Sequence, residues 1–359
     1  MLKSPPFSFA SLLCRIKKQY LMLPMMYFTF NGCIPYLFHV GSEQGRILWH
    51  REKIDTIIKN ETLDTEGIQK LKLIQKAREF SISKLALNEK GGFEYFTKLD
   101  REEIGWNVSA CEQLAFKSYT WWFPIAGTVP YKGYFDKSLA IEEENNLKSK
   151  GYDTRVRAIG GYSTLGWFSD PVLSPQLKWE NFRLVGLVIH EMAHATAYLP
   201  GDSNLNESYA SFVEEKGMEM YYELLEGKNS KTLQEAKKSK SRRKEIFSIL
   251  KKHANLLELL YNSNQTKEEK LFQKQKIISE FKEEILKLKI IPEDKMNEFR
   301  KREWNNEDFL GVLRYHSGSE EFELLFQKSD RDFKTFHMEV KKIFSLPTEE
   351  RKKILNLPD

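Results

Sequence analysis

An apolar run from Leu184 to Ala197 constrains the fold most, because it carries two histidines and a glutamate inside an otherwise hydrophobic segment. Its length fits a helix, and Pro200 and Gly201 give a stop signal directly after it. A helix this apolar is buried, and buried imidazoles need polar partners. The sequence therefore predicts a core helix over about 182–198 that gathers polar side chains inside the fold.

The polar residues of this helix have the spacing of a metal site. Residues 190–194 read HEMAH. In a helix, His190 and His194 lie one turn apart on one face, so both imidazoles can bind one ion. Neutral imidazoles suit zinc, and Glu191 can accept a proton from a water on the metal. We therefore expect one Zn²⁺ per chain, with these histidines as ligands and Glu191 as general base.

A third ligand is expected, because a catalytic zinc usually has three protein ligands and one open position. The link after the first helix is short, so the next helix, about 204–225, packs back against it and brings Glu207 near in its opening turn. Asp202 and Glu214 are the alternatives. Glu214 lies seven residues after Glu207 on the same helix face, so it can instead hold a ligand histidine by a hydrogen bond, or face solvent.

The rest of the chain mixes helix and strand, which predicts an α+β fold that is mostly helical. The elements expected are helices over 46–90 (interrupted at Gly67), 136–150, most of 228–302, 306–316 and 331–343, and short strands within 106–135 and 152–168. With 359 residues, 41% of them hydrophobic, the chain can bury a sizeable core. We expect one domain over 33–359, in which about 228–302 is a Lys-rich helical subdomain.

The first 33 residues resemble an export signal. They contain no acid and four bases, Lys3, Arg15, Lys17 and Lys18. An apolar stretch over 20–30 follows, and then Gly32 and Cys33, as in a signal with a lipid-accepting thiol. We expect 1–32 to be the export segment and Cys33 to carry a lipid that anchors the protein to a bacterial membrane, facing the periplasm. A plain cleaved signal and a cytoplasmic protein are the alternatives.

Charge and hydropathy exclude two classes of protein. The formal net charge is +5, and without the basic N-terminal segment the chain is nearly neutral, so composition predicts no nucleic-acid partner. No apolar run reaches the roughly 18 residues that a membrane span needs, which excludes a multi-pass membrane protein.

The helix pair, with an Asn-Glu step at the start of the second helix, resembles the gluzincin metallopeptidases, the thermolysin-like group. The resemblance implies a thermolysin-like core and makes Glu207 the third zinc ligand. The spacing departs from the group, since only 12 residues separate His194 from Glu207. Gluzincins also place a Tyr or His donor from a late element against the developing oxyanion. Here that implies Tyr315 or His316, with Tyr162 as a further candidate.

Most of the chain, from Cys33 to about Leu346, resembles a bacterial family of predicted aminopeptidases, typically lipoproteins. The segments that carry the resemblance are 123–127, 131–135, 161–171, the two metal helices, and Asn305-Asn306 with Tyr315. The resemblance implies a zinc peptidase acting on peptide substrates. Whether it cleaves at a free N-terminus stays open, because the Gly-x-Met-Glu-Asn motif of one aminopeptidase group is missing.

Other interpretations stay open beside this one. A non-catalytic lipid-anchored protein with a structural zinc would need a fourth protein ligand. A zinc endopeptidase or an amidase on another substrate would use the same ligands. Residues 156–168 could form an edge strand that receives an extended peptide, or an ordinary core strand. Six bases within 237–244 are typical of a solvated helix face, or of a patch that faces anionic lipid.

Overall fold

The computed structural model describes residues 34–123, 127–159, 170–314 and 319–355. They fall into two units, residues 1–50 and 51–359, which are described separately. The described part of the first unit is a single helix, α2 (Ile34–Trp49). None of the helices within the described ranges combines the length and the apolar character needed to cross a bilayer.

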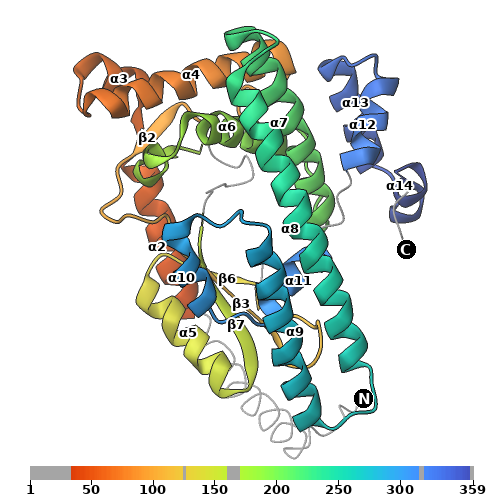
Figure 1. The fold of residues 1–359 in the computed structure, drawn as a ribbon. Coiled ribbons are helices and arrows are strands. Elements are labelled where there is room, and N and C mark those ends of the chain that lie inside the picture. Colours follow the sequence, from red (N-terminus) through yellow and green to blue (C-terminus); the bar gives the residue numbers. More distant parts are fainter. Residues whose placement is uncertain (1–33, 124–126, 160–169, 315–318, 356–359) are drawn as a thin grey trace, which may run out of the picture. The chain divides into compact units, whose positions relative to one another are not determined.

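The second unit contains helices and short strands in mixed order (Figure 1). Its strands are β1 (Glu52–Lys53), β2 (Tyr95–Thr97), β3 (Trp106–Glu112), β4 (Trp121–Phe123), β5 (Gly127–Val129), β6 (Lys132–Tyr134), β7 (Tyr152–Ala158) and β8 (Val172–Leu173). Its helices are α3 (Ile54–Asn60), α4 (Thr65–Leu85), α5 (Lys137–Ser149), the 3-10 helix η1 (Ser174–Lys178), α6 (Asn181–Thr196), α7 (Ser203–Glu226), α8 (Lys231–Tyr261), α9 (Lys267–Lys287), α10 (Glu293–Lys301), α11 (Asn306–Arg314), α12 (Ser319–Lys328), α13 (Phe333–Phe344) and α14 (Thr348–Ile354). The α+β class with mostly helical content is confirmed, whereas the thermolysin-like core stays a prediction.

The strands form three small sheets. In the largest, β3 lies between β6 and β7 and is antiparallel to both, with Trp106 opposite Tyr134 on one side and Ala158 on the other. In the second, β2 lies between β1 and β8, and it is parallel to β8. Strands β4 and β5 form a hairpin. The predicted strands within 106–135 are confirmed, and β7 occupies the described start of the predicted segment 152–168.

Two hydrophobic cores organise this unit. The first is built by α3, α4, α6, α7, α12 and α13 around fully buried residues such as Ile189 and Phe336. The second is built by α8, α9 and α11 around Phe281 and Phe309. Helix α8 reaches both, because Leu233 near its start belongs to the first core and Leu257 near its end to the second. Helices α6 and α7, which carry the predicted metal ligands, therefore belong to the first core.

The predicted helix over 46–90 is wrong in detail. Two non-helical segments, residues 50–53 and 61–64, divide it into three helices. Gly67, where we expected the interruption, lies in the first turn of α4. Glu61 takes a left-handed conformation with φ of 50° and ends α3. The Asp64 side chain then accepts a hydrogen bond from the Gly67 amide and caps α4. The capping aspartate, rather than the glycine, marks the break.

The predicted helices over 136–150, 182–198, 204–225 and 228–302 are confirmed as α5, α6, α7 and α8 to α10. The predicted helix over 306–316 is confirmed as α11 up to Arg314, and its last two positions lie outside the described residues. Near the C-terminus the prediction was incomplete. It included a helix over 331–343, which corresponds to α13, but it omitted α12 and α14. The predicted domain boundaries stay predictions.

Candidate metal centre

The link between α6 and α7 explains why the two helices pack together. Asp202 caps α7, since its side chain accepts from the Leu205 amide at 3.0 Å. The Asn206 amide group binds the backbone of Leu199 twice, accepting from its N–H and donating to its carbonyl, both at 2.8 Å. Asn206 is only 1% exposed, so these bonds form a buried clamp. The clamp sets the start of α7 beside the end of α6 and places Glu207 opposite the histidines.

The residues predicted as metal ligands converge. The His190 Nε2 and His194 Nε2 atoms lie 3.2 Å apart. Glu207 Oε2 lies 3.4 Å from the first of these nitrogens, and Glu207 Oε1 lies 3.4 Å from the second. Within the described residues, these three side chains form the only group of at least three His, Cys, Asp or Glu residues that could hold a metal ion.

The distances suit a small divalent cation. Ligand atoms about 2.0–2.1 Å from a tetrahedral zinc lie about 3.3–3.4 Å from one another. The two imidazole nitrogens lie close to this edge length at 3.2 Å, and Glu207 lies 3.4 Å from each of them, through a different carboxylate oxygen in each case. The carboxylate can therefore offer an ion one oxygen or both. The described residues His190, His194 and Glu207 can together hold a divalent cation.

Glu214 determines which nitrogen of His190 faces the site. Its Oε2 atom lies 3.0 Å from His190 Nδ1. A carboxylate accepts hydrogen bonds, so Nδ1 carries a proton, and in the neutral ring Nε2 has the lone pair that can bind a metal. Of the two alternatives for Glu214, the structure therefore has the hydrogen bond to His190, although the side chain is also 39% exposed. The alternative in which Asp202 is the third ligand is not supported, because its carboxylate caps α7.

The site attracts positive charge. Burial opposes a charge on His190, but the hydrogen bonds to Glu207 and Glu214 outweigh it and, with the charge of Glu191, raise the pKa of His190 to about 10. The hydrogen bonds to His190 and His194 hold the pKa of Glu207 far below its usual range despite some burial. The carboxylates that favour a proton here would also favour a divalent cation.

The structure places the predicted general base beside the ligands. Glu191 follows His190 on α6, is partly exposed, and contributes to the raised pKa of His190 through its charge. Tyr198 also lies near, with its ring 6.5 Å from the His194 ring and 40% of its surface exposed. Tyr198 is not among the predicted site residues. Its position four residues after His194, just beyond α6, was the available signal.

Several predicted residues lie outside the described part of the chain. They are Cys33, Tyr162, Tyr315 and His316.

Two histidines without metal spacing are buried structural residues. His253 Nδ1 bonds to the Ile249 carbonyl, and His337 lies between the Tyr209 hydroxyl and the Leu85 carbonyl, 2.9 Å from each.

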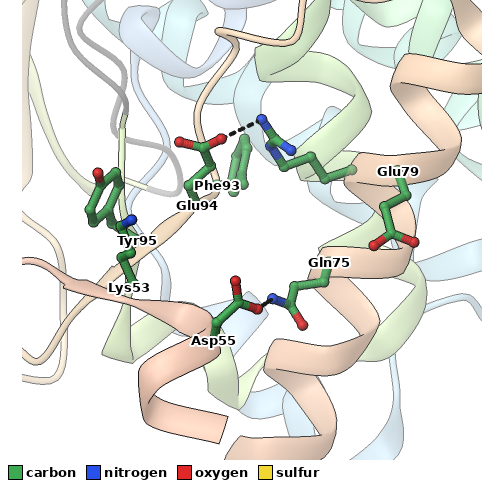
Figure 2. A pocket seen from close by; sticks show the side chains of 8 residues that line it. Lys53, Asp55, Gln75, Glu79, Phe93, Glu94 and Tyr95 are labelled. Carbon is green, nitrogen blue, oxygen red and sulfur yellow. Dashed lines mark hydrogen bonds and ion pairs between the residues drawn. The ribbon is translucent and has the colours of Figure 1, made fainter. Parts of the chain in front are cut away.

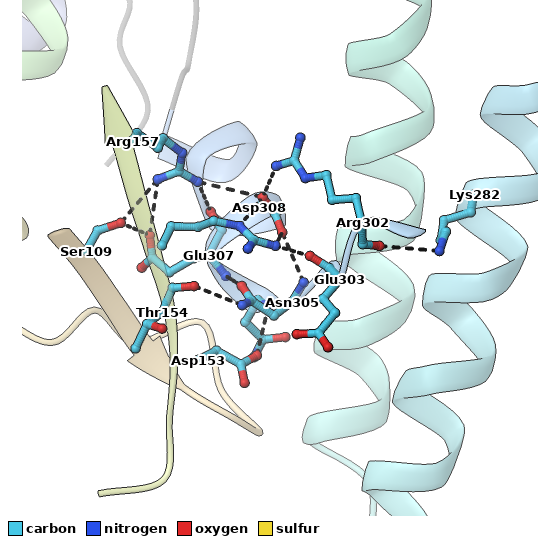
Figure 3. Close-up of polar contacts among 12 residues, drawn as sticks. Ser109, Asp153, Thr154, Arg157, Lys282, Arg302, Glu303, Asn305, Glu307 and Asp308 are labelled. Atoms are coloured by element: carbon cyan, nitrogen blue, oxygen red, sulfur yellow. Dashed lines mark hydrogen bonds and ion pairs between the residues drawn. The ribbon is translucent and has the colours of Figure 1, made fainter. Parts of the chain in front are cut away.

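The first residues of the predicted substrate edge 156–168 lie on β7. Just before them, the Thr154 carbonyl accepts a hydrogen bond from Asn305 Nδ2 at 3.0 Å, so the residue that precedes α11 occupies this position (Figure 3). Further along the strand, the Arg157 guanidinium donates to Ser109 Oγ at 3.1 Å and to the Glu307 carbonyl at 3.0 Å. Residues 160–168 of the expected edge are outside the described residues.

The structure contains a buried network of polar groups that was not predicted from the sequence. We call it the Lys274 network, formed by Lys274, Asp153, Asn306 and Tyr261. Lys274 Nζ donates to Asp153 Oδ2 at 2.6 Å, and the backbone N–H of Asn306 donates to the same oxygen at 2.8 Å. The Tyr261 hydroxyl donates to the side-chain oxygen Oδ1 of Asn306 at 2.6 Å. The network joins β7, α8, α9 and α11. Its members are far apart in sequence, so no local sequence pattern indicates that they lie together.

A polar hollow of about 280 Å³ lies between α3, α4 and β2 (Figure 2). Unlike the candidate metal centre, it has side chains that pair with one another. Gln75 donates to Asp55 at 2.6 Å, and Arg78 pairs with Glu94 at 2.8 Å. Arg78 also donates to the carbonyls of Glu89 and Gly92. These polar groups satisfy one another across the hollow.

Taken together, fold and site define an α+β protein whose two packed helices present a candidate site for a divalent metal. The chain belongs to the family described as "Putative aminopeptidase", which it matches over residues 35–355. The family is one of peptidases, which are hydrolases acting on peptides. Comparison with curated proteins gave no match. Comparison with solved structures gave none either.

Proposed function

We propose that this protein is a zinc-dependent aminopeptidase in which His190, His194 and Glu207 hold the metal and Glu191 is the general base. One observation carries the proposal: three candidate ligands from two helices face one another, with nitrogen–nitrogen and nitrogen–oxygen distances of 3.2 to 3.4 Å. Membership of the aminopeptidase family supports the peptide substrate. The contact of Glu214 with His190 supports a metal role, because it leaves the imidazole lone pair pointing at the other ligands.

When bound, zinc would act as a Lewis acid toward the scissile carbonyl and make an attacking water more acidic. The protein's own residues supply the remaining steps. Glu191 accepts the proton of the attacking water and then gives it to the leaving amine. Glu214 keeps His190 in one tautomer throughout. We further propose Tyr315 or His316 as the donor to the oxyanion, as the gluzincin resemblance implies.

The number of ligands favours a catalytic metal over a structural one. Structural zinc sites are closed by four protein ligands. Among the described residues, no fourth His, Cys, Asp or Glu joins the group of three. Glu207 also has 45% of its side chain exposed, which leaves the centre open to solvent and to a substrate. A structural zinc would require a ligand from outside the described ranges.

A peptide-cleavage assay tests the proposed function. Peptides with free and with acetylated N-termini are incubated with zinc-loaded protein, with and without a chelator. We expect release of the first residue from free peptides only, with activity lost on chelation and restored by Zn²⁺. Equal cleavage of both peptide sets at internal bonds would identify an endopeptidase. Undiminished cleavage in the chelator would contradict a metal-dependent mechanism.

We also propose that the protein is exported and anchored to a bacterial membrane by a lipid on Cys33, with its site on the periplasmic side. The basic and apolar N-terminal segment that ends at Cys33 supports this. Growth with a radiolabelled fatty acid, followed by fractionation, tests it. The wild-type chain should carry the label and sediment with membranes, and Cys33→Ser should do neither. A labelled Cys33→Ser chain would contradict this assignment.

A further inference from the structure

Gly186 lies one turn before His190 on α6, and its place in the fold explains how Glu214 reaches that histidine. Gly186 is buried in the middle of a helix, where glycine is less stable than alanine. A Cβ atom at this position would lie 2.7 Å from Glu214 Oε1, 3.5 Å from Cδ and 3.7 Å from Cγ. The missing side chain therefore leaves the space that the Glu214 carboxylate occupies.

The two helices cannot separate freely to make room for a larger residue. Three residues further along α7 than Glu214, a Cβ on Gly217 would lie 2.6 Å from Leu85 Cδ1 and 3.1 Å from Ile189 Cγ2. Ile189 and Leu85 are fully buried, so α6, α7 and α4 are in close contact here. A methyl group on residue 186 would therefore displace the carboxylate rather than the helices.

We propose that Gly186 is a positioning residue for the metal site: it gives the Glu214 carboxylate the room to bind His190 Nδ1 and so to orient this ligand. The inference rests on the proposed function, because it assigns Gly186 a role toward the metal. The 3.0 Å bond between His190 Nδ1 and Glu214 Oε2 is the contact that a methyl group would break. Loss of such an outer contact typically lowers metal affinity about 10- to 100-fold.

Zinc affinity of the metal-free chain, measured by competition with a chromophoric chelator, tests the inference. We expect Gly186→Ala to bind Zn²⁺ about 10- to 100-fold more weakly than the wild type. Gly311→Ala is the matched control, because Gly311 is also a helical glycine but has no atom within 4 Å of an added Cβ. Its zinc affinity should equal that of the wild type. Thermal unfolding of the metal-free variants separates a loss of affinity from a loss of fold.

A double-mutant comparison with Glu214→Ala distinguishes a positioning role of Gly186 from a general loss of folding. Glu214→Ala should lose affinity to a similar degree, and Gly186→Ala combined with Glu214→Ala should bind no more weakly than Glu214→Ala alone. This double variant also has room for the new methyl group, so it provides the test if Gly186→Ala does not fold. Losses that multiply, or a Gly186→Ala chain with wild-type affinity, would overturn the inference and leave the proposed function intact. A wild-type chain that binds no divalent ion would overturn both.

Discussion

The candidate metal centre and the Lys274 network are both clusters of polar side chains, and they differ in which groups they bring together. In the network, Lys274 and the Asn306 backbone N–H donate to Asp153, and Tyr261 donates to Asn306, so donors meet acceptors. At the candidate metal centre, the Nε2 atoms of His190 and His194 and the Glu207 carboxylate face one another, and each of these groups can be a metal ligand. The network is complete without a ligand, whereas we propose that a cation completes the metal centre.

The carboxylates of the two clusters also differ in exposure. The side chains of Lys274 and Asp153 are 3% and 11% exposed, so this ion pair is nearly buried. Glu207 and Glu214 are 45% and 39% exposed, although His190 and His194 beside them are only 18% and 7% exposed. Breaking a buried ion pair leaves an uncompensated charge and destabilises the fold, whereas the binding of a ligand to an open site adds stability. The comparison therefore predicts that mutations in the two clusters change different measured quantities.

The largest effect is expected from Glu191→Gln. It removes the proton acceptor and keeps the shape of the side chain, so kcat/KM for a peptide should fall about 10²- to 10⁴-fold while zinc content is unchanged. Steady-state kinetics and metal analysis of the same preparation check this. Glu142→Gln, an exposed change on α5, is the control and should keep wild-type rates. A Glu191→Gln chain with full activity would exclude the general-base role.

Lys274→Met should affect stability instead. It leaves the Asp153 carboxylate buried without its cation, which typically costs about 3–5 kcal/mol of unfolding free energy. Denaturant unfolding measures this cost. Lys252→Met is the control, because Lys252 pairs with Glu284 on the surface, where a pair contributes about 0–1 kcal/mol. The folded fraction of Lys274→Met should bind zinc normally. Weakened zinc binding with unchanged stability would reverse the roles assigned to the two clusters.

His337 offers a smaller, pH-dependent test, because it is a histidine in a closed environment. Burial lowers the pKa of His337 to about 4, below its usual value of 6.5. Below pH 6.5 the unfolded chain therefore binds a proton that the folded chain does not bind until about pH 4. The contribution of this histidine, about 3 kcal/mol, should be lost as pH falls from 6.5 to 4.

Urea unfolding of the wild type and of His337→Gln at a series of pH values measures this contribution. Glutamine can still donate to the Leu85 carbonyl and accept from the Tyr209 hydroxyl, the two contacts of the native ring. The variant should lose less stability than the wild type between pH 6.5 and 4. Parallel curves for the two proteins would show that His337 is already charged in the folded state.

The sequence could predict the site to the extent that local geometry determines it. The i, i+4 spacing of His190 and His194 and the short capped link to Glu207 need only helix geometry and a turn. The Lys274 network could not be predicted, because Lys274 lies 121 positions after Asp153 in the chain. Gly186 likewise has a meaning only once α7 is packed against α6. Contacts between distant elements, unlike helix periodicity, leave no local pattern in the chain.

The zinc content of purified chains, reconstituted with a small excess of Zn²⁺ and then dialysed, tests the metal assignment most directly. We expect one zinc per chain for the wild type and for Glu215→Ala, an acid on α7 that pairs with Lys240 on α8. We expect little or no retained zinc for His190→Ala and for Glu207→Ala. A Glu207→Ala chain that keeps one zinc with wild-type affinity would contradict the claim that these three side chains hold a single ion.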